Sequence, residues 1–318
     1  MTKHFNLFRP GLFLLLVSCS LLLLVSCQSA TDDTVVPEGQ STITFSVSNY
    51  RQVSFDDLSR ASTRAEVPTN HPSTLAHLVV AVFDAETGEQ ACSHIQHDYK
   101  DYENNPYAYP QFSVTLSYGH YRVLVLGYNG SQACNVTSLS HISWDSDYVP
   151  NTFLYCDEFT LNKETETTKE ITLRHVVAAF RVTAEDAIPA EMEKMRFVST
   201  AGGTVLDATT GFAVENAGRT SDIKVPANYN GKQDVPFTIY IFLPEEQITT
   251  NYTVQALGNN DALIIEKYFN NVPLRINYLT EWKGKFFEAS DDEDPSGEQR
   301  GFSIEWNMDW AGKLTYEP

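Results

Sequence analysis

Hydrophobic and polar residues alternate along much of the chain from about residue 40 onward. In "STITFSVSNY" (41–50), Ile43, Phe45 and Val47 are separated by polar residues. This alternation predicts a β-strand with one buried face. Other segments rich in β-branched and aromatic residues, bounded by Gly, Asn, Asp or Pro, also predict strands. They are "HLVVAVFDAETGE", "PQFSVTLSYGHYRVLVLGYNG", "HVVAAFRVTAED", "VPFTIYIFLPEE", "NYTVQALGN", "ALIIEKYFN", "YLTEWKGKFFEA" and "GFSIEWNMDW".

Helical patterns are scarce. Only Ala190–Phe197 has the character of a helix, and a short one. Because long amphipathic helices do not alternate with the strands, the sequence predicts an all-β, sandwich-like fold rather than a parallel α/β sheet. The polar segment "KETETTK" (Lys163–Lys169) is either a domain boundary or a hairpin tip. Two domains, 41–170 and 171–318, fit the length better.

The chain begins with the features of a signal peptide. Lys3 and Arg9 precede an apolar run from Leu12 to Val25, which is shorter than the roughly twenty residues needed to span a bilayer. "LLVSC" occurs twice in this region, ending at Cys19 and at Cys27.

Only the second copy has a full apolar core before it and a polar chain after it. "LVSC" ending at Cys27 resembles the lipobox of bacterial lipoproteins. This resemblance implies a signal peptide over 1–26, cleavage between Ser26 and Cys27, lipidation of Cys27 and a polar tether over 27–40. An ordinary secretory peptide with an incidental cysteine is the alternative.

Charge and cysteine content narrow the function classes. The formal net charge of −19 argues against binding nucleic acid or anionic lipid through a basic surface. Beyond the signal region, Cys92, Cys134 and Cys156 contain no CxxC pair, so a zinc site is not indicated. They are either one disulfide with a thiol left over, or three buried small hydrophobic residues.

Catalytic motifs are absent from the sequence. It contains no G-x-S-x-G elbow, Walker loop, HExxH or kinase-type loop, and its histidines are scattered. Asp291–Asp294 is either a calcium-attracting run or a solvated charge run, and it lacks EF-hand spacing. Paired carboxylates of a glycosidase come from distant segments and are not visible in a sequence. We therefore expect no catalytic residue, no metal and no cofactor.

One irregular stretch differs from the strands. "YKDYENNPYAYPQ" (Tyr99–Gln111) concentrates tyrosines outside the alternating pattern. Aromatic residues in strands are explained by core packing, but those in an irregular segment are available for contact. This stretch is a candidate contact loop.

The order and spacing of the strand motifs over residues 41–312 resemble the fimbrillin superfamily, the type V pilins and their accessory subunits. The resemblance depends on a lipobox, the early strand "STITFSVSNY", the arginine-containing "LSRASTRAEVP", and the segments Val272–Tyr278 and Phe302–Trp310.

Membership would imply two tandem transthyretin-like β-sandwich domains with Greek-key-type strands. Ile43, Phe45 and Val47 match the detachable first strand of such subunits, and Arg60 and Arg64 match the site where a protease cuts. The donor region that fills a neighbour's vacated groove matches Phe302, Ile304, Trp306 and Trp310. The tail after Trp310 has only eight residues, which is short for a donor.

The function expected from this resemblance is a fimbrial subunit or fimbrillin-like adhesin, which is not an enzyme. Its partners would be other pilin subunits, the outer membrane through the lipid, and a host or bacterial surface ligand, without nucleic acid. The alternatives are a pilus anchor that keeps its lipid and a surface glycan-binding lipoprotein. A secreted hydrolase is a third possibility.

Overall fold

The computed structural model describes residues 39–51, 69–70, 75–288 and 312–313. These residues form β-strands joined by turns and four short 3-10 turns, without an α-helix. The all-β prediction is confirmed. No helix in this part of the chain is long and apolar enough to cross a membrane. Several predicted site residues lie outside it: Ser26, Cys27, Arg60, Arg64, Asp291–Asp294, Phe302, Ile304, Trp306 and Trp310.

The first half of the chain forms a sandwich of two layers. One layer is antiparallel, in the order β4 (Gln90–Asp98), β3 (His77–Asp84), β6 (Gly119–Asn129) and β9 (Asn151–Leu161). In the other layer, β1 (Gln40–Arg51) pairs with β5 (Gln111–Ser117), β10 (Thr168–His175) and β2 (Thr69–Asn70). Only two residue pairs, between β9 and β10, join the layers into one sheet.

The two layers enclose a hydrophobic cluster that we call the first core. All of these strands except β2 contribute apolar side chains to it at alternate positions, as strand geometry requires. Its members include Ile43, Phe45, Val47, Leu78, Val80, Val82, Phe112, Val114, Leu116, Val123, Val125, Phe153, Ile171 and Leu173.

The opposite faces of β3 and β6 are also buried. Val79, Ala81, Leu124 and Leu126 pack in a second cluster, the junction core, which also contains side chains of a small sheet. That sheet has the order β14 (Phe212–Ala213), β13 (Leu206–Asp207), β8 (His141–Trp144) and β7 (Cys134–Ser138). Burial on both faces explains why "HLVVAVF" and "VLVL" are continuous apolar runs.

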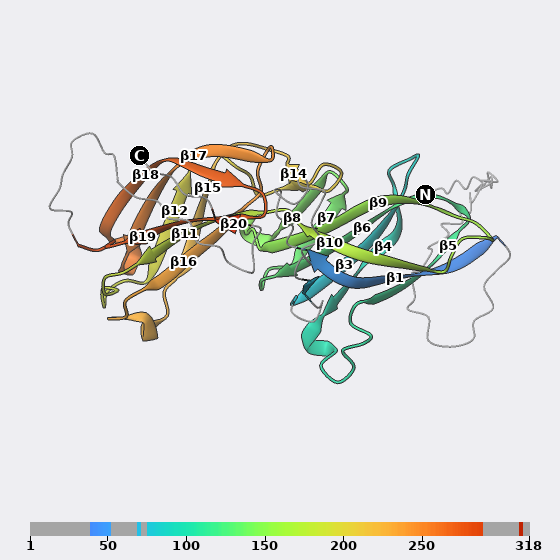
Figure 1. Ribbon diagram of the computed structural model, residues 1–318, viewed down its shortest axis with the longest axis horizontal. Coiled ribbons are helices and arrows are strands. Elements are labelled where there is room, and N and C mark those ends of the chain that lie inside the picture. Colours follow the sequence, from blue (N-terminus) through green and yellow to red (C-terminus); the bar gives the residue numbers. More distant parts are fainter. Residues whose placement is uncertain (1–38, 52–68, 71–74, 289–311, 314–318) are drawn as a thin grey trace, which may run out of the picture.

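The second half forms another sandwich, seen at the left of Figure 1. One sheet has the order β16 (Val235–Ile241), β11 (Ala178–Ala184), β19 (Tyr278–Gly284) and β20 (Gly312–Lys313). The facing sheet has the order β15 (Arg219–Lys224), β12 (Lys194–Ser199), β17 (Gln247–Leu257) and β18 (Leu263–Arg275). Between them lies the second core, with Phe180, Phe197, Tyr252, Phe269 and Trp282 at its centre.

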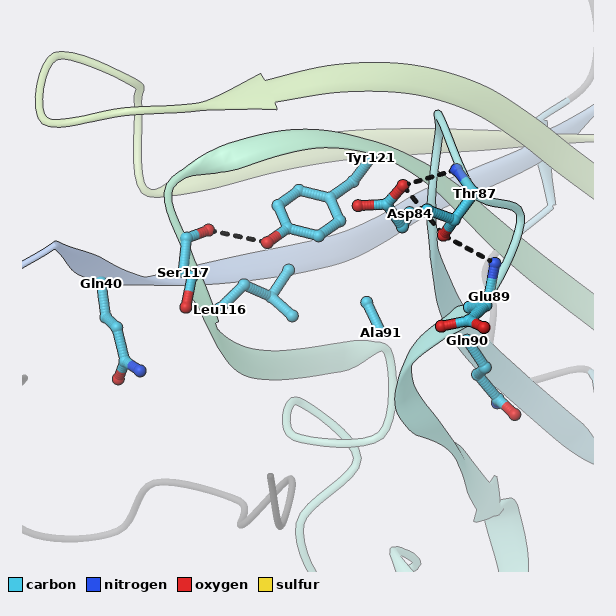
Figure 2. Close-up of a pocket in the computed structure, with 9 residues that line it drawn as sticks. All are labelled: Gln40, Asp84, Thr87, Glu89, Gln90, Ala91, Leu116, Ser117 and Tyr121. Carbon is cyan, nitrogen blue, oxygen red and sulfur yellow. Dashed lines mark hydrogen bonds between the residues drawn. The ribbon is translucent and has the colours of Figure 1, made fainter. Parts of the chain in front are cut away.

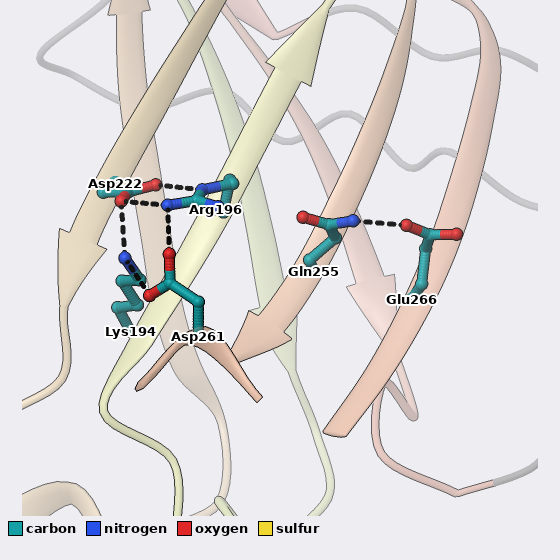
Figure 3. A network of polar contacts seen from close by, with 6 residues as sticks. All are labelled: Lys194, Arg196, Asp222, Gln255, Asp261 and Glu266. Carbon is teal, nitrogen blue, oxygen red and sulfur yellow. Dashed lines mark hydrogen bonds and ion pairs between the residues drawn. The ribbon is translucent and has the colours of Figure 1, made fainter. Parts of the chain in front are cut away.

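A network of charges lies on the outer face of the second sandwich (Figure 3). Arg196 donates two hydrogen bonds to Asp222, at 2.7 and 2.8 Å, and Lys194 contacts Asp222 and Asp261 at 2.9 and 2.6 Å. The hydrogen bonds from Arg196 and Lys194 hold the pKa of Asp222 below its ordinary value. Such exposed pairs add little stability, and they link β12 to β15 and to the turn that carries Asp261.

The predicted helix at Ala190–Phe197 is wrong. Lys194–Ser199 is the strand β12, and only a turn precedes it. Met195 and Phe197 are buried in the second core, while Lys194 and Arg196 face the charge network. Pairing with β15 and β17 on both sides outweighs the local helix preference of "AEMEKM".

The division into domains 41–170 and 171–318 stays a prediction. The predicted boundary falls inside β10, whose Ile171 and Leu173 belong to the first core. The segment Lys163–Lys169 is mostly the turn between β9 and β10. The chain passes from the first sandwich to the second at Val176 and Val177, which are buried in the junction core.

The three cysteines behave as small hydrophobic residues. Cys92 is buried in the first core, and Cys134 is buried in the junction core with Cys156 half-buried beside it. Burial raises the pKa of the Cys134 thiol to about 12 and that of Cys156 to about 11. Cys134 and Cys156 are not joined in a disulfide.

His175 is the last residue of β10, next to the point where the chain crosses from the first sandwich to the second. Its Nδ1 lies 2.7 Å from Oδ1 of Asn277, its Nε2 lies against Asn151, and its ring stacks on Phe153 with centroids 4.4 Å apart. Burial lowers the pKa of His175 to about 3. The imidazole is therefore neutral in the folded protein at neutral pH.

We expect this buried imidazole to make the protein sensitive to mild acid. In the unfolded chain the pKa of a histidine is about 6.5, so below that pH the unfolded state binds a proton that the folded state does not. The free energy of unfolding should fall with decreasing pH from about 6.5, by as much as about 1.4 kcal/mol per pH unit for this group.

Urea unfolding between pH 7.5 and 5.5 measures this slope, with H175Q as the test variant and H141Q, at an exposed histidine, as the control. The slope should be shallower in H175Q and unchanged in H141Q. Identical slopes for wild type and H175Q would contradict the assignment.

Candidate functional site

The predicted detachable strand is β1, and its three apolar side chains point into the first core. Ile43, Phe45 and Val47 are 1%, 0% and 1% exposed. The alternate residues face outward, where the hydroxyls of Thr42 and Thr44 lie 2.8 and 2.9 Å from those of Thr115 and Ser113 on β5. The alternation read in the sequence is thus the alternation between core and outer face.

Both edges of β1 are hydrogen-bonded to other strands. Its first half pairs antiparallel with β5, from Gln40–Ser117 to Ser46–Gln111. Its second half pairs parallel with β10, beginning at Thr44–Thr168 and shifting register after Val47. Between residues 44 and 46 the strand is paired on both sides at once. A strand from the start of the chain therefore lies inserted between two strands far along it.

The groove that β1 fills is apolar. The ring of Phe45 packs edge-on against Phe159, with centroids 5.6 Å apart. Phe112, Val114 and Leu116 of β5, together with Ile171 and Leu173 of β10, share the same core. Burying one such side chain is worth roughly 1.5–3 kcal/mol, so three of them approach the whole stability of a typical domain. The first sandwich needs a strand in this position.

A pocket of about 330 Å³ lies where β1 begins (Figure 2). Gln40 and Ser117 line one side, and Asp84, Thr87 and Glu89 of the turn between β3 and β4 line the other.

The polar groups of this pocket are used within the fold. Tyr121 donates its hydroxyl to the carbonyl of Ser117 at 2.8 Å. Asp84 accepts hydrogen bonds from the backbone of Thr87 and Glu86 at 2.8 and 3.0 Å, which hold the pKa of Asp84 below its ordinary value. The lining contains no His, Cys or Lys, and the Thr87 hydroxyl donates to Asp84 at 3.1 Å as part of the same turn. This pocket is the open end of the β1 groove.

Metal-binding groups are not found in the described part of the chain, where no three His, Cys, Asp or Glu side chains gather. Of the residues predicted for lipidation, processing and strand exchange, the structure brings together Ile43, Phe45 and Val47, and it does not describe the others. Near the C-terminus, β20 pairs in parallel with the first two residues of β19, through Gly312 and Lys313.

Sequence reasoning did not identify which strands form the walls of the groove. The period-two pattern of "QFSVTLS" predicted the strand β5, and "EITLRH" carries the same signal for β10. Nothing in either pattern says that β1 is their shared partner, because strand pairing depends on contacts across more than 60 residues in sequence.

We expect Phe45→Ala to cost about 3–5 kcal/mol of unfolding free energy, the usual range for a fully buried phenylalanine. The control Thr44→Ala removes one outer-face hydroxyl contact and should cost about 1 kcal/mol or less. Urea denaturation of the full chain measures both. Equal and small losses in the two variants would contradict a structural role for the inner face of β1.

A comparison with protein families gives one match. The model described as "Family of unknown function (DUF6562)" matches residues 33–314. No curated protein matches the chain.

Several solved structures align with most of the chain at low identity. The C-terminally truncated tip fimbrial protein Mfa3 from Porphyromonas gingivalis is 11% identical and has a TM-score of 0.38, with 79% of this chain and 97% of that chain covered. The fimbrial anchor protein Mfa2 from the same species is 13% identical, with a TM-score of 0.34 and coverage of 71% and 81%. An adhesin candidate from Bacteroides ovatus is 11% identical, with a TM-score of 0.42 and coverage of 76% and 88%. These identities are too low to transfer a function.

Proposed function

The chain belongs to this family of unknown function, and from that premise we propose that it is a fimbrial structural subunit or fimbrillin-like surface adhesin. The subunit would be exported as a lipoprotein and would assemble by exchange of β-strands, without enzymatic activity. The observation that carries the proposal is the position of β1, which is inserted between β5 and β10 with three side chains in the first core.

Cleavage of the segment that follows β1 would allow this strand to leave. Residues 52–68 connect β1 to β2, and they include Arg60 and Arg64. A cut after either arginine would leave β1 held only by non-covalent contacts. Cys27 and its lipid precede β1 in sequence, so they would depart together with the strand.

The vacated groove defines the strand that could replace β1. The incoming strand would run antiparallel to β5 and parallel to β10, with apolar side chains at three alternate positions. Main-chain hydrogen bonds would supply affinity and the side-chain positions would supply specificity, as in other cases of strand addition. The segment of a neighbouring subunit that contains Phe302, Ile304, Trp306 and Trp310 is the proposed donor.

The alternative within the same proposal is an anchor subunit. If the segment 52–68 stays uncut, β1 remains in its groove and Cys27 retains its lipid. The subunit would then end the polymer at the cell outer membrane. A surface-exposed position suits the strongly negative charge of the chain, which keeps exported proteins soluble.

N-terminal sequencing of surface-extracted protein tests this proposal. We expect a mature start at Ala61 or Ala65 and, without boiling, a ladder of SDS-resistant polymers. The double variant R60A/R64A should lose both the new N-terminus and the ladder. The control K163A, in the turn between β9 and β10, should keep both.

The opposite outcome is also informative. Protein that starts only at lipid-modified Cys27 and forms no ladder would contradict the processed-subunit role and support the anchor. Processed protein that forms no ladder would contradict strand exchange itself.

A further inference from the structure

The loop between β4 and β5 projects away from the first sandwich (teal in Figure 1). It is built from four successive turns over residues 99–111. Each turn is closed by a backbone hydrogen bond, from Tyr102 to Tyr99, Asn105 to Tyr102, Ala108 to Asn105 and Gln111 to Ala108, at 2.8–3.1 Å. A regular series of closed turns holds the loop in one shape.

Buried aromatic side chains hold the base of this loop. Tyr109 is 0% exposed, and its hydroxyl donates to the carbonyl of Leu75 at 2.8 Å. Nδ1 of His97 lies 2.9 Å from the carbonyl of Tyr109, so this nitrogen carries the proton and donates it. The His97 ring stacks on Phe112 at 4.0 Å and lies 4.6 Å from the ring of Tyr102.

Tyr107 differs from the other tyrosines of the loop in its solvent exposure. Tyr99, Tyr102 and Tyr109 contact other rings, whereas Tyr107 is 83% exposed, the largest value among the exposed large hydrophobic side chains described. It lies in the turn that begins at Asn105. Exposed polar residues precede it at the tip: Glu103, Asn104 and Asn105.

We propose that this tip, formed by Glu103, Asn104, Asn105 and Tyr107, binds a neutral carbohydrate. The face of the Tyr107 ring carries partial negative charge, which suits the C–H face of a pyranose. The amides and the carboxylate beside it can hydrogen-bond to sugar hydroxyls. The inference is independent of strand exchange, because it depends only on contacts within this loop and its base.

Size and charge select a sugar over other ligands. One exposed ring and three small polar side chains offer far less than the roughly 800 Å² that each partner contributes to a stable protein interface. A single sugar unit is of matching size. The chain's net charge of −19 disfavours acidic glycans and nucleic acid.

The fixed shape of the loop explains how so small a site could bind a sugar. Because the four turns and the buried aromatics fix the tip before binding, little conformational entropy is lost on contact. A single tip would bind weakly. Many copies displayed on one surface would bind a polysaccharide with useful avidity.

Affinity electrophoresis of the full chain tests the proposal, with gels containing mannan, galactan, xylan, an α-glucan or a β-glucan. We expect retardation in at least one gel. Tyr107→Ala should weaken the association constant roughly fivefold or more, the loss expected for one aromatic contact, and Tyr107→Trp should retain binding. The matched control is Tyr268→Ala, at another exposed tyrosine (57% exposed), which should bind like the wild type.

Three results would overturn the proposal. They are no retardation in any of these gels, retardation that survives Tyr107→Ala, and retardation that Tyr268→Ala reduces as much as Tyr107→Ala does. Because Tyr107 is exposed, its variants should fold normally, and circular dichroism spectra that match the wild type check this.

Discussion

The insertion of β1 between β5 and β10 is the contact on which the first sandwich depends. One strand near the start of the chain supplies Ile43, Phe45 and Val47 to the first core and pairs with strands that begin at residues 111 and 168. Without it, an apolar groove and two unpaired strand edges would face water, which is an aggregation hazard. The first sandwich is therefore complete only when a strand fills this position.

The junction core does not depend directly on β1. The junction core contains side chains from β3 and β6 and from the small sheet, but none from β1, β5 or β10. His175, with its contacts to Asn151 and Asn277, fixes the crossover to the second sandwich. The side chains of the junction core could therefore stay packed when β1 leaves, although β10, which carries His175, would lose a partner strand. This separation is what a subunit that exchanges one strand requires.

Sequence reasoning identified individual strands more reliably than it identified which strands pair or pack together. Ile43, Phe45 and Val47 were assigned to one buried face from their spacing, because period-two alternation is a local property. The double burial of β3 and β6 was not predictable, since a continuous apolar run says nothing about what covers its second face. Ala190–Phe197 was misread because pairing with β15 and β17 overrides local helix preference. The Tyr-rich loop stood out in sequence, but only the structure separates the braced Tyr109 from the exposed Tyr107.

The most direct test of the account is strand replacement in a chain cut within residues 52–68. The cut protein would be mixed in mild denaturant with an isotope-labelled peptide of the 12 residues of β1 and followed by native mass spectrometry. The account predicts that the labelled peptide replaces β1 while the rest of the chain stays folded, and that a peptide with Phe45→Asp does not. Failure of the labelled peptide to replace β1, or unfolding of both sandwiches when β1 leaves, would contradict the account.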